Sequence, residues 1–160
     1  MVAESEFLIK VDRMQSSDLD EVMAIEVQSF SLPWTEEMFL SELKGGEHAE
    51  NLVARAVLEE GAKPQIVGYI CLWVLKEELH INNIAVHPQF RQHGIAKRLL
   101  SYAFELGRKK GAKSAVLEVR ASNRAALTLY EKFGFKVAGV RRRYYSHPTE
   151  DALIMRKDDL

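Results

Sequence analysis

The stretch HPQFRQHGIAKRLL, residues 87–100, places a polar turn directly before a basic segment with the spacing of a helix. A helix N-terminus leaves backbone N–H groups without partners and carries partial positive charge, so it can bind an anion such as phosphate. Gly94 removes a side chain where a phosphate would approach the backbone, and Ala96 is the smallest alternative to a second glycine. The pattern R-x-x-G-x-A after an apolar run therefore indicates a phosphate-binding loop.

The alternative for this stretch is a loop glycine followed by a solvated basic helix face. Arg91 and Lys97 add positive charge that suits a phosphate, but they suit a surface helix equally well. The chain contains neither G-x-x-x-x-G-K-[ST] nor G-x-G-x-x-G, so the other common phosphate loops do not fit. The residues alone favour neither interpretation.

Glu118 lies between apolar residues in SAVLEVRA, which predicts a strand. On a half-buried strand a carboxylate loses water, which raises its pKa and makes it a better base near neutral pH. The alternative is a surface glutamate that pairs with Arg120, two residues along on the same face. Without further context the residues favour the ion pair.

Two more polar residues lie at or within the expected helix over residues 124–134. Tyr130 lies near Ala126 and Phe133, and an aromatic residue at this spacing is usually part of the core. Asn123 precedes the helix and is first of all a candidate N-cap, although a capping side chain can also contact a ligand.

Other chemistry has less support. Cys71 lies in GYICLWV and is expected to be a buried small hydrophobic residue, with no motif for a nucleophile. The histidines show no metal-ligand spacing, so no metal site is expected. Arg141–Arg143 followed by Tyr144 and Tyr145 could bind nucleic acid by charge and stacking. Alternate residues of a strand face opposite sides, however, so we prefer a rim for an acceptor peptide.

The elements that must position these residues follow from hydrophobic periodicity. The pattern predicts the order β-α-α-β-β-β-α-β-α-β-β, in which two late β-to-α crossovers follow a hairpin-rich first half. The fold class is therefore α/β, with a mixed, mostly antiparallel sheet flanked by helices. The expected strands span residues 7–14, 51–59, 65–77, 78–86, 114–121, 135–145 and 151–157, and the expected helices span residues 16–30, a short segment from Thr35, about 94–109 and 124–134.

Composition limits the class of protein. The 160 residues fit one domain, 1–160, and apolar residues at 47% with charged residues at 28% are typical of a soluble globular chain. A net charge of −1 gives no general attraction to nucleic acid or membrane. A single cysteine allows no internal disulfide and predicts a reducing compartment. With no signal peptide or membrane-length apolar run in view, we expect a cytoplasmic protein without nucleic-acid or membrane partners.

IAVHPQFRQHGIAKRLL resembles the acetyl-CoA motif [RQ]-x-x-G-x-[GA] of the GCN5-related N-acetyltransferase (GNAT) family, and the likeness extends over essentially the whole chain. LEVRASN, ALTLYEKFGF, RRRYY and EDALIM are similar to the bacterial subgroup that acetylates the N-terminal alanine of a ribosomal protein. The resemblance implies the GNAT fold, acetyl-CoA as co-substrate without a metal, and acetyl transfer to a protein N-terminus by direct attack. The expected acceptor is the N-terminal alanine of a small-subunit ribosomal protein. Alternatives are an enzyme for other N-termini or small amines, and a non-catalytic CoA- or flavin-binding module.

The resemblance also implies roles for individual residues. Glu118 would be the general base and Tyr130 the general acid that protonates the departing thiolate. The backbone of Ile84–Val86 would bind the pantetheine arm, and Asn123 would contact the cofactor. The residues of the cofactor site would thus be Ile84, Ala85, Val86, Gln92, His93, Gly94, Ile95, Ala96, Lys97 and Asn123, with the amides of Gln92 to Lys97 holding the pyrophosphate.

Overall fold

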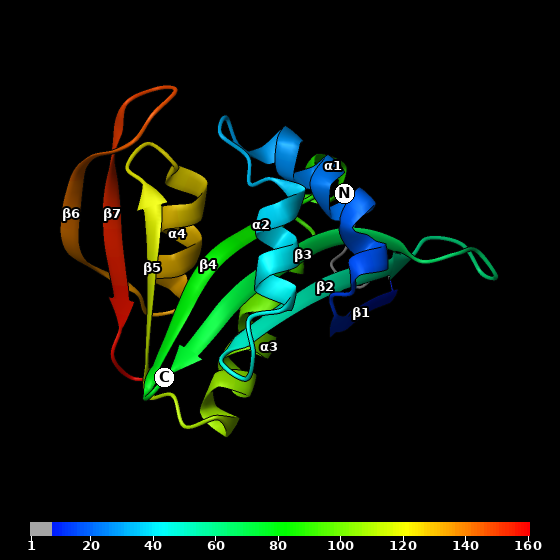
Figure 1. Ribbon diagram of the computed structural model, residues 1–160, viewed down its shortest axis with the longest axis horizontal. Coiled ribbons are helices and arrows are strands. Elements are labelled where there is room, and N and C mark those ends of the chain that lie inside the picture. Colours follow the sequence, from blue (N-terminus) through cyan, green and yellow to red (C-terminus); the bar gives the residue numbers. More distant parts are fainter. Residues whose placement is uncertain (1–7) are drawn as a thin grey trace.

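The computed structural model describes residues 8–160, which form a curved sheet with helices on both faces (Figure 1). The elements are β1 (Leu8–Arg13), α1 (Leu19–Ser29), α2 (Glu36–Leu43), β2 (Ala49–Val57), β3 (Gln65–Leu75), β4 (Glu78–Val86), α3 (Ile95–Lys109), β5 (Ser114–Arg120), α4 (Arg124–Lys132), β6 (Lys136–Tyr145) and β7 (Glu150–Lys157). The predicted order of strands and helices is confirmed. Residue 7, expected at the start of the first strand, lies outside the described residues.

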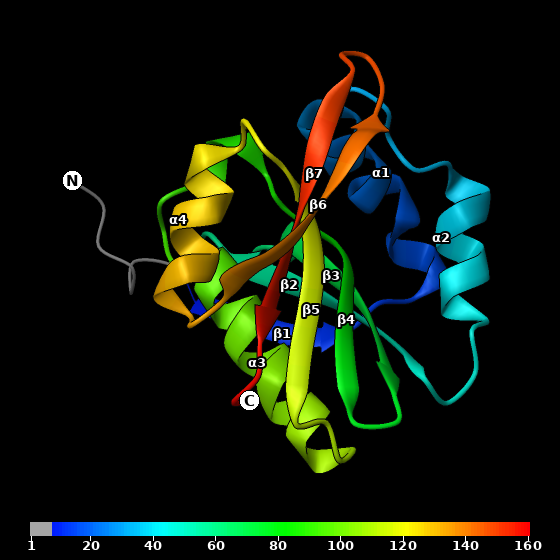
Figure 2. The same ribbon diagram turned by 90° about the vertical axis from the view of Figure 1, so that its left-hand side faces the viewer.

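The sheet has the strand order β1-β2-β3-β4-β5-β7-β6. Each neighbouring pair is antiparallel except β4 and β5, which run parallel, so the expected mixed, mostly antiparallel sheet is confirmed. Helices α1 and α2 cover one face, and α3 and α4 cover the other (Figure 2). Each face buries its own apolar cluster, because both sides of the central strands carry hydrophobic side chains.

Strands β4 and β5 separate halfway along their length. Their pairing runs from Glu78 opposite Ser114 to Ile81 opposite Leu117 and stops there. Beyond that point β4 pairs only with β3, and β5 pairs only with β7. A bulge in β4 falls at the same place, since Leu72 faces Ile81 while Cys71 faces Asn83. The two strands therefore diverge as a V, which is visible in Figure 1.

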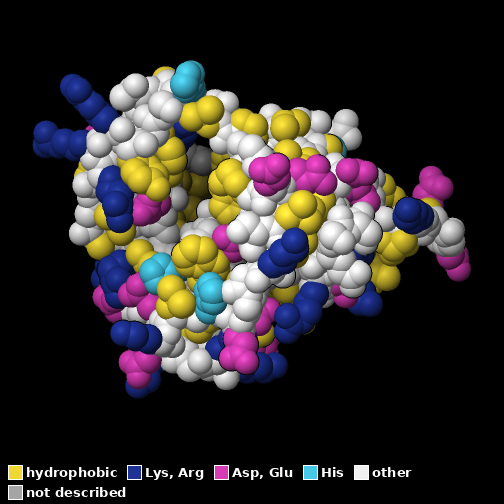
Figure 3. Space-filling view, in the orientation of Figure 1, with side chains coloured by type: hydrophobic (Ala, Val, Ile, Leu, Met, Phe, Trp, Pro, Cys, Tyr) yellow, Lys and Arg dark blue, Asp and Glu magenta, His cyan; other side chains and the backbone are white. Residues whose placement is uncertain are grey.

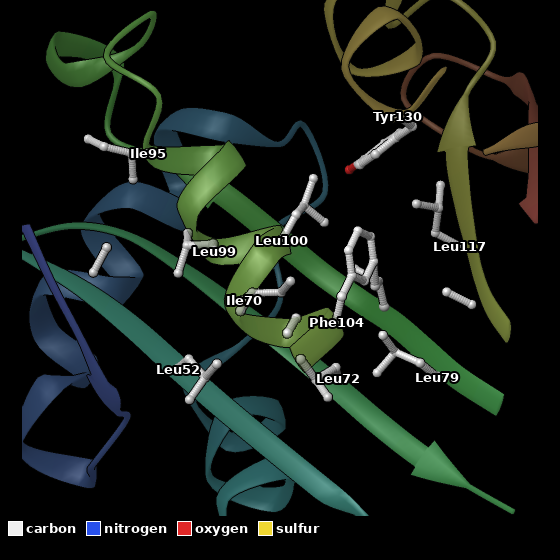
Figure 4. Packing of buried hydrophobic residues seen from close by; sticks show 14 of the residues in the cluster. Leu52, Ile70, Leu72, Leu79, Ile95, Leu99, Leu100, Phe104, Leu117 and Tyr130 are labelled. Carbon is white, nitrogen blue, oxygen red and sulfur yellow. The ribbon is translucent and has the colours of Figure 1, made fainter. Parts of the chain in front are cut away.

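Helix α3 packs closely against the sheet along its apolar face, where Leu99, Leu100 and Phe104 are buried (Figure 4). Full burial of one such side chain contributes about 1.5–3 kcal/mol. Gly68 of β3 allows the close approach, because a Cβ atom there would lie 3.0 Å from the Ala85 carbonyl oxygen and 3.1 Å from Ile95 Cγ2. The first turn of α3 is thus held directly above β3 and β4.

The start of the first helix differs from the prediction. We expected Ser16, Ser17 or Asp18 to cap a helix over residues 16–30, but a 3-10 turn occupies Ser16–Asp18 and α1 begins at Leu19. The Asp18 carboxylate accepts from the Gln15 N–H at 2.9 Å and from Arg55 Nη2 at 2.9 Å. Asp18, one of the predicted candidates, is the N-cap residue of α1, but its carboxylate is committed to the preceding turn and to β2 and makes no capping hydrogen bond.

Candidate active site

The loop between β4 and α3 has the backbone shape that the phosphate-loop interpretation requires. Gln92 and Gly94 both adopt positive φ angles, 65° and 76°, and Gly94 is the N-cap of α3. Among the described residues no side chain caps this 15-residue helix. Its first-turn amides are therefore left for another partner, and an anion is the partner that the helix dipole favours.

The basic residues of this loop also hold the polypeptide together. Arg91 Nε donates to the Val86 carbonyl oxygen at 3.3 Å, which ties the loop back to β4. Arg98 Nη1 donates to the Ile9 carbonyl oxygen at 3.2 Å, which joins α3 to β1. Their charge lies near the N-terminus of α3, but part of their hydrogen-bonding capacity is used internally.

The edge of β4 that faces β5 is unpaired beyond Ile81, so the backbone of Ile84–Val86 can receive an extended ligand as an added strand. Asn82, at the bulge, provides a second feature. Its side-chain Nδ2 is buried and has no hydrogen-bond partner within residues 8–160. A buried donor without a partner costs about 1–3 kcal/mol. An amide-bearing arm such as pantetheine supplies the acceptors that this edge lacks, so the residues present fit the co-substrate.

Glu118 is the first residue of β5 after its pairing with β4 ends. Its carboxylate lies 3.0 Å from Arg141 Nε, and its side chain is 28% exposed. The alternative pairing with Arg120 does not form, because Arg120 binds Glu150 at 3.3 Å instead. Two residues along a strand are separated by about 6.6 Å, so both side chains can point the same way and still take partners from other strands.

Tyr130 lies on α4 and is 6% exposed, with its ring 5.8 Å from that of Phe135. Burial raises its pKa above the ordinary value. Figure 4 shows its hydroxyl pointing away from α4, toward the side of α3. The ring is a core residue, as its spacing predicts, while the side chain also borders the cleft described next. Asn123 is the N-cap of α4 and accepts from the Ala126 N–H at 3.2 Å, which confirms the predicted cap.

A cleft of about 480 Å³ fills the space where β4 and β5 diverge. It is visible as a hollow between the β5–β7 side and the α1 side of the molecule (Figure 3). The cleft brings together Glu118, Tyr130, Asn123 and Ile84, four of the residues singled out in the sequence. The residues around Gly94 do not line it. His93, Gly94 and Lys97 border a separate recess of about 720 Å³ beside β1.

The cleft also contains a carboxylate that the sequence analysis did not select. Glu26 of α1 is 1% exposed, and its oxygens accept from the Tyr69 hydroxyl at 2.5 Å, from Asn83 Nδ2 at 2.8 Å and from the Trp34 N–H at 2.8 Å. Burial and the Glu26 carboxylate raise the pKa of Tyr69. The only signal in the sequence was a glutamate on an otherwise apolar helix face, because its three donors come from distant segments.

The entrance to the cleft is formed by segments that are far apart in the sequence. Residues Phe30, Ser31, Leu32 and Trp34 line it from the loop between α1 and α2, and Tyr145 and Pro148 line it from the hairpin of β6 and β7. Burial raises the pKa of Tyr145 to about 12. The Glu118 carboxylate raises the pKa of Tyr144, which is 54% exposed and whose ring lies under the Arg141 guanidinium.

In the described part of the chain, the remaining reactive or metal-binding side chains give no support for another kind of site. Cys71 is fully buried in the α1 side of the core, and burial raises its pKa, so it remains a thiol away from solvent. Across residues 8–160 we find no group of three or more His, Cys, Asp or Glu side chains placed to bind a metal ion. None of the helices in that range is both long enough and apolar enough to cross a membrane.

Comparison with known proteins agrees with this architecture. The sequence model of the Acetyltransferase (GNAT) family matches residues 19–135. A Bacillus subtilis relative, named provisionally as a [ribosomal protein bS18]-alanine N-acetyltransferase, is 39% identical over 145 residues, covering 91% of this chain and 92% of that protein. The Escherichia coli (strain K12) protein of that name is 33% identical over 149 residues, covering 91% and 94%. The crystal structure of the Escherichia coli enzyme superposes with a TM-score of 0.82 at 31% identity, covering 96% of each chain.

The diverging parallel strands with the cleft between them, together with the glycine-containing turn before α3, are features of an acyl-CoA-binding α/β fold. The chain belongs to the GNAT acetyltransferase family. It is an acetyl-CoA-dependent N-acetyltransferase, with acetyl-CoA as its co-substrate.

Proposed function

We propose that this enzyme acetylates the N-terminal α-amine of a protein, and that its acceptor is the N-terminal alanine of a small-subunit ribosomal protein. The observation that carries the proposal is the cleft, which places the Glu118 carboxylate and Tyr130 on one cavity beside the unpaired edge of β4. The Escherichia coli relative, whose name states that it acts on the alanine of ribosomal protein bS18, supports the acceptor. A ribosomal-protein acceptor also places the reaction in the cytoplasm, and we propose that residues 1–160 act as one catalytic domain.

In this proposal the co-substrate is held mainly by backbone groups. The amides of Gln92, His93, Gly94, Ile95, Ala96 and Lys97 bind the pyrophosphate at the start of α3, because the N-terminus of a helix carries partial positive charge that favours an anion. The backbone of Ile84, Ala85 and Val86 binds the pantetheine arm along the free edge of β4. Asn123 contributes from the start of α4 while it caps that helix.

Glu118 and Tyr130 carry out the two proton transfers of the reaction. The amine nitrogen forms a C–N bond with the acetyl carbon, the C–S bond breaks, the amine proton passes to Glu118 and the sulfur receives a proton from Tyr130. Arg141 keeps the Glu118 carboxylate in place at 3.0 Å. Because the pKa of Tyr130 is raised, the phenol stays protonated at neutral pH, and its fixed position rather than its acidity supports donation to the developing thiolate.

The free energy needed to deprotonate the acceptor favours an α-amine over a lysine side chain. With reference pKa values near 7.8 and 10.4, the neutral amine costs about 1 kcal/mol for an α-amine and about 4.6 kcal/mol for lysine at pH 7. A single glutamate base suits the smaller cost. We propose that the loop at Phe30–Trp34 and the hairpin at Tyr144 and Tyr145 form a narrow slot, which suits a small first side chain.

Three peptides of one sequence test the proposal: one with a free N-terminal alanine, one with a free N-terminal leucine, and one with a blocked N-terminus and an internal lysine. We expect the highest kcat/KM for the alanine peptide and almost no acetylation of the blocked peptide, measured by release of CoA thiol. Equal or faster acetylation of the blocked lysine peptide would disprove the N-terminal acceptor and leave the acetyltransferase assignment intact.

A further inference from the structure

The Arg120 guanidinium contacts both walls of the acceptor cleft. On the hairpin side, Nη2 donates to the Ser146 carbonyl oxygen at 3.0 Å, and Nη1 donates to the Pro148 carbonyl oxygen at 3.1 Å and to Glu150 Oε1 at 3.3 Å. On the opposite side, Nη2 donates to Ser31 Oγ at 3.3 Å, in the loop between α1 and α2. These two segments lie side by side at the top of Figure 1.

Two further contacts connect Arg120 to the reaction centre. Its guanidinium carbon lies 4.4 Å from the centre of the Tyr145 ring, which lines the cleft. Glu150, its ion-pair partner, also accepts from the Ser122 N–H at 2.6 Å, in the turn that leads to Asn123. Arg120 therefore links the hairpin to the turn before α4 as well as to the opposite wall.

The hairpin benefits from such an anchor because its pairing is interrupted just before the turn. The register of β6 against β7 is broken between Arg141 and Tyr145, and Arg143 has a φ angle of 53°. Beyond this break, the pair of Tyr145 and Glu150 flanks the turn of residues 146–149. A planar guanidinium with several donors in fixed directions can bind two carbonyl oxygens, a carboxylate, a hydroxyl and a ring face together, which a lysine ammonium cannot do.

We propose that Arg120 is a positioning residue for the acceptor, which sets the width of the cleft by joining the β6–β7 hairpin to the loop between α1 and α2. This inference rests on the proposed function, since it assumes that the acceptor N-terminus enters between these two segments. A fixed, narrow entrance admits a small first side chain and holds its amine near Glu118. Loosening it weakens acceptor binding and reduces discrimination, while acetyl-CoA still binds at the start of α3 and along β4.

The experiment compares Arg120→Lys and Ser31→Ala with the wild-type enzyme. Arg120→Lys keeps the charge and removes the fork of donors, whereas Ser31→Ala removes only the contact to the opposite wall and lies on an exposed loop that tolerates it. Arg156→Lys is the matched control, because Arg156 pairs with Glu78 and Asp158 and does not line the cleft. We measure kcat and KM for the alanine and leucine peptides, the acetyl-CoA Kd by calorimetry, and the melting temperature.

Arg120→Lys should raise KM for the alanine peptide and lower the alanine-to-leucine ratio of kcat/KM, each by about tenfold, because small displacements of a bound reactant are costly. Ser31→Ala should change the KM and the alanine-to-leucine ratio in the same direction by a smaller factor. The acetyl-CoA Kd should stay unchanged in both variants, and Arg156→Lys should behave as the wild type. An unchanged alanine-to-leucine ratio of kcat/KM in both variants would overturn the inference. An equal loss of kcat/KM for both peptides, in proportion to a fall in melting temperature, would also overturn it. A wild-type enzyme that acetylates neither peptide would instead overturn the proposed function, and this inference with it.

Discussion

Glu118 lies where β5 leaves β4, on the cleft, with its carboxylate 3.0 Å from Arg141 and next to Tyr144. We predict that Glu118→Gln lowers turnover by roughly 10²- to 10⁴-fold at neutral pH, the usual contribution of a positioned general base. The rate should recover partly at higher pH, where the amine loses its proton without help. Steady-state kinetics from pH 6 to pH 10 provide the measurement.

Glu77→Gln is a suitable control for this variant, because Glu77 is exposed and pairs only with Lys113 among the described residues. A Glu118→Gln enzyme with the wild-type rate across the pH range would remove Glu118 from the mechanism.

Tyr130 gives a second prediction at the scale of single residues. Tyr130→Phe should lower kcat with little change in acetyl-CoA affinity, since the ring stays packed against Phe135. Burial raises the pKa of Tyr130 above its unfolded value near 10, so the folded enzyme keeps the proton at pH values where a free tyrosine begins to lose it. We therefore expect no loss of kcat from tyrosine ionisation between pH 7 and pH 10. A decline in that range that disappears in Tyr130→Phe would contradict this expectation.

At the scale of elements, the proposed pyrophosphate site lies at the junction of β4 and α3. Gly94→Asp adds bulk and negative charge at the N-cap of α3, so acetyl-CoA affinity should fall by well over tenfold, about 1.4 kcal/mol or more. Calorimetry measures this directly on the folded variant.

The matched control for Gly94→Asp is Gly111→Asp. Gly111 has a φ angle of 92° and follows the other end of α3, so the backbone strain is similar while the phosphate site is untouched. If both variants bind acetyl-CoA as the wild type does, the pyrophosphate must bind elsewhere.

At the scale of the whole molecule, Glu26 joins α1, the loop at Trp34 and strands β3 and β4 through one buried carboxylate. Glu26→Ala leaves the Tyr69 hydroxyl, the Asn83 amide and the Trp34 N–H without their acceptor, so we predict a loss of about 3 kcal/mol in the free energy of unfolding. Urea denaturation of the full chain measures it. Glu21→Ala, which removes a single hydrogen bond to the Ile66 N–H, should cost clearly less. Equal losses in the two variants would contradict a central role for Glu26.

Much of the fold could be predicted because strands and helices follow from short-range patterns. The alternation of LEVR, the helix that starts at Thr35 and the cap at Asn123 are local features, and all appear in the structure. The GNAT resemblance likewise depends on short motifs around Gly94 and Glu118. These motifs were sufficient for the family and for the co-substrate.

Only the three-dimensional arrangement decided which charged groups meet. Glu118 pairs with Arg141 rather than with its neighbour Arg120, because β7 brings β6 within reach of β5 and the hairpin turn provides better acceptors for Arg120. Glu26 becomes the centre of a buried network only when its donors arrive from positions 8, 43 and 57 residues away. Hydrophobic periodicity does not predict contacts between residues so far apart in the sequence. It indicates which face of an element is buried, but not which distant partner that face contacts.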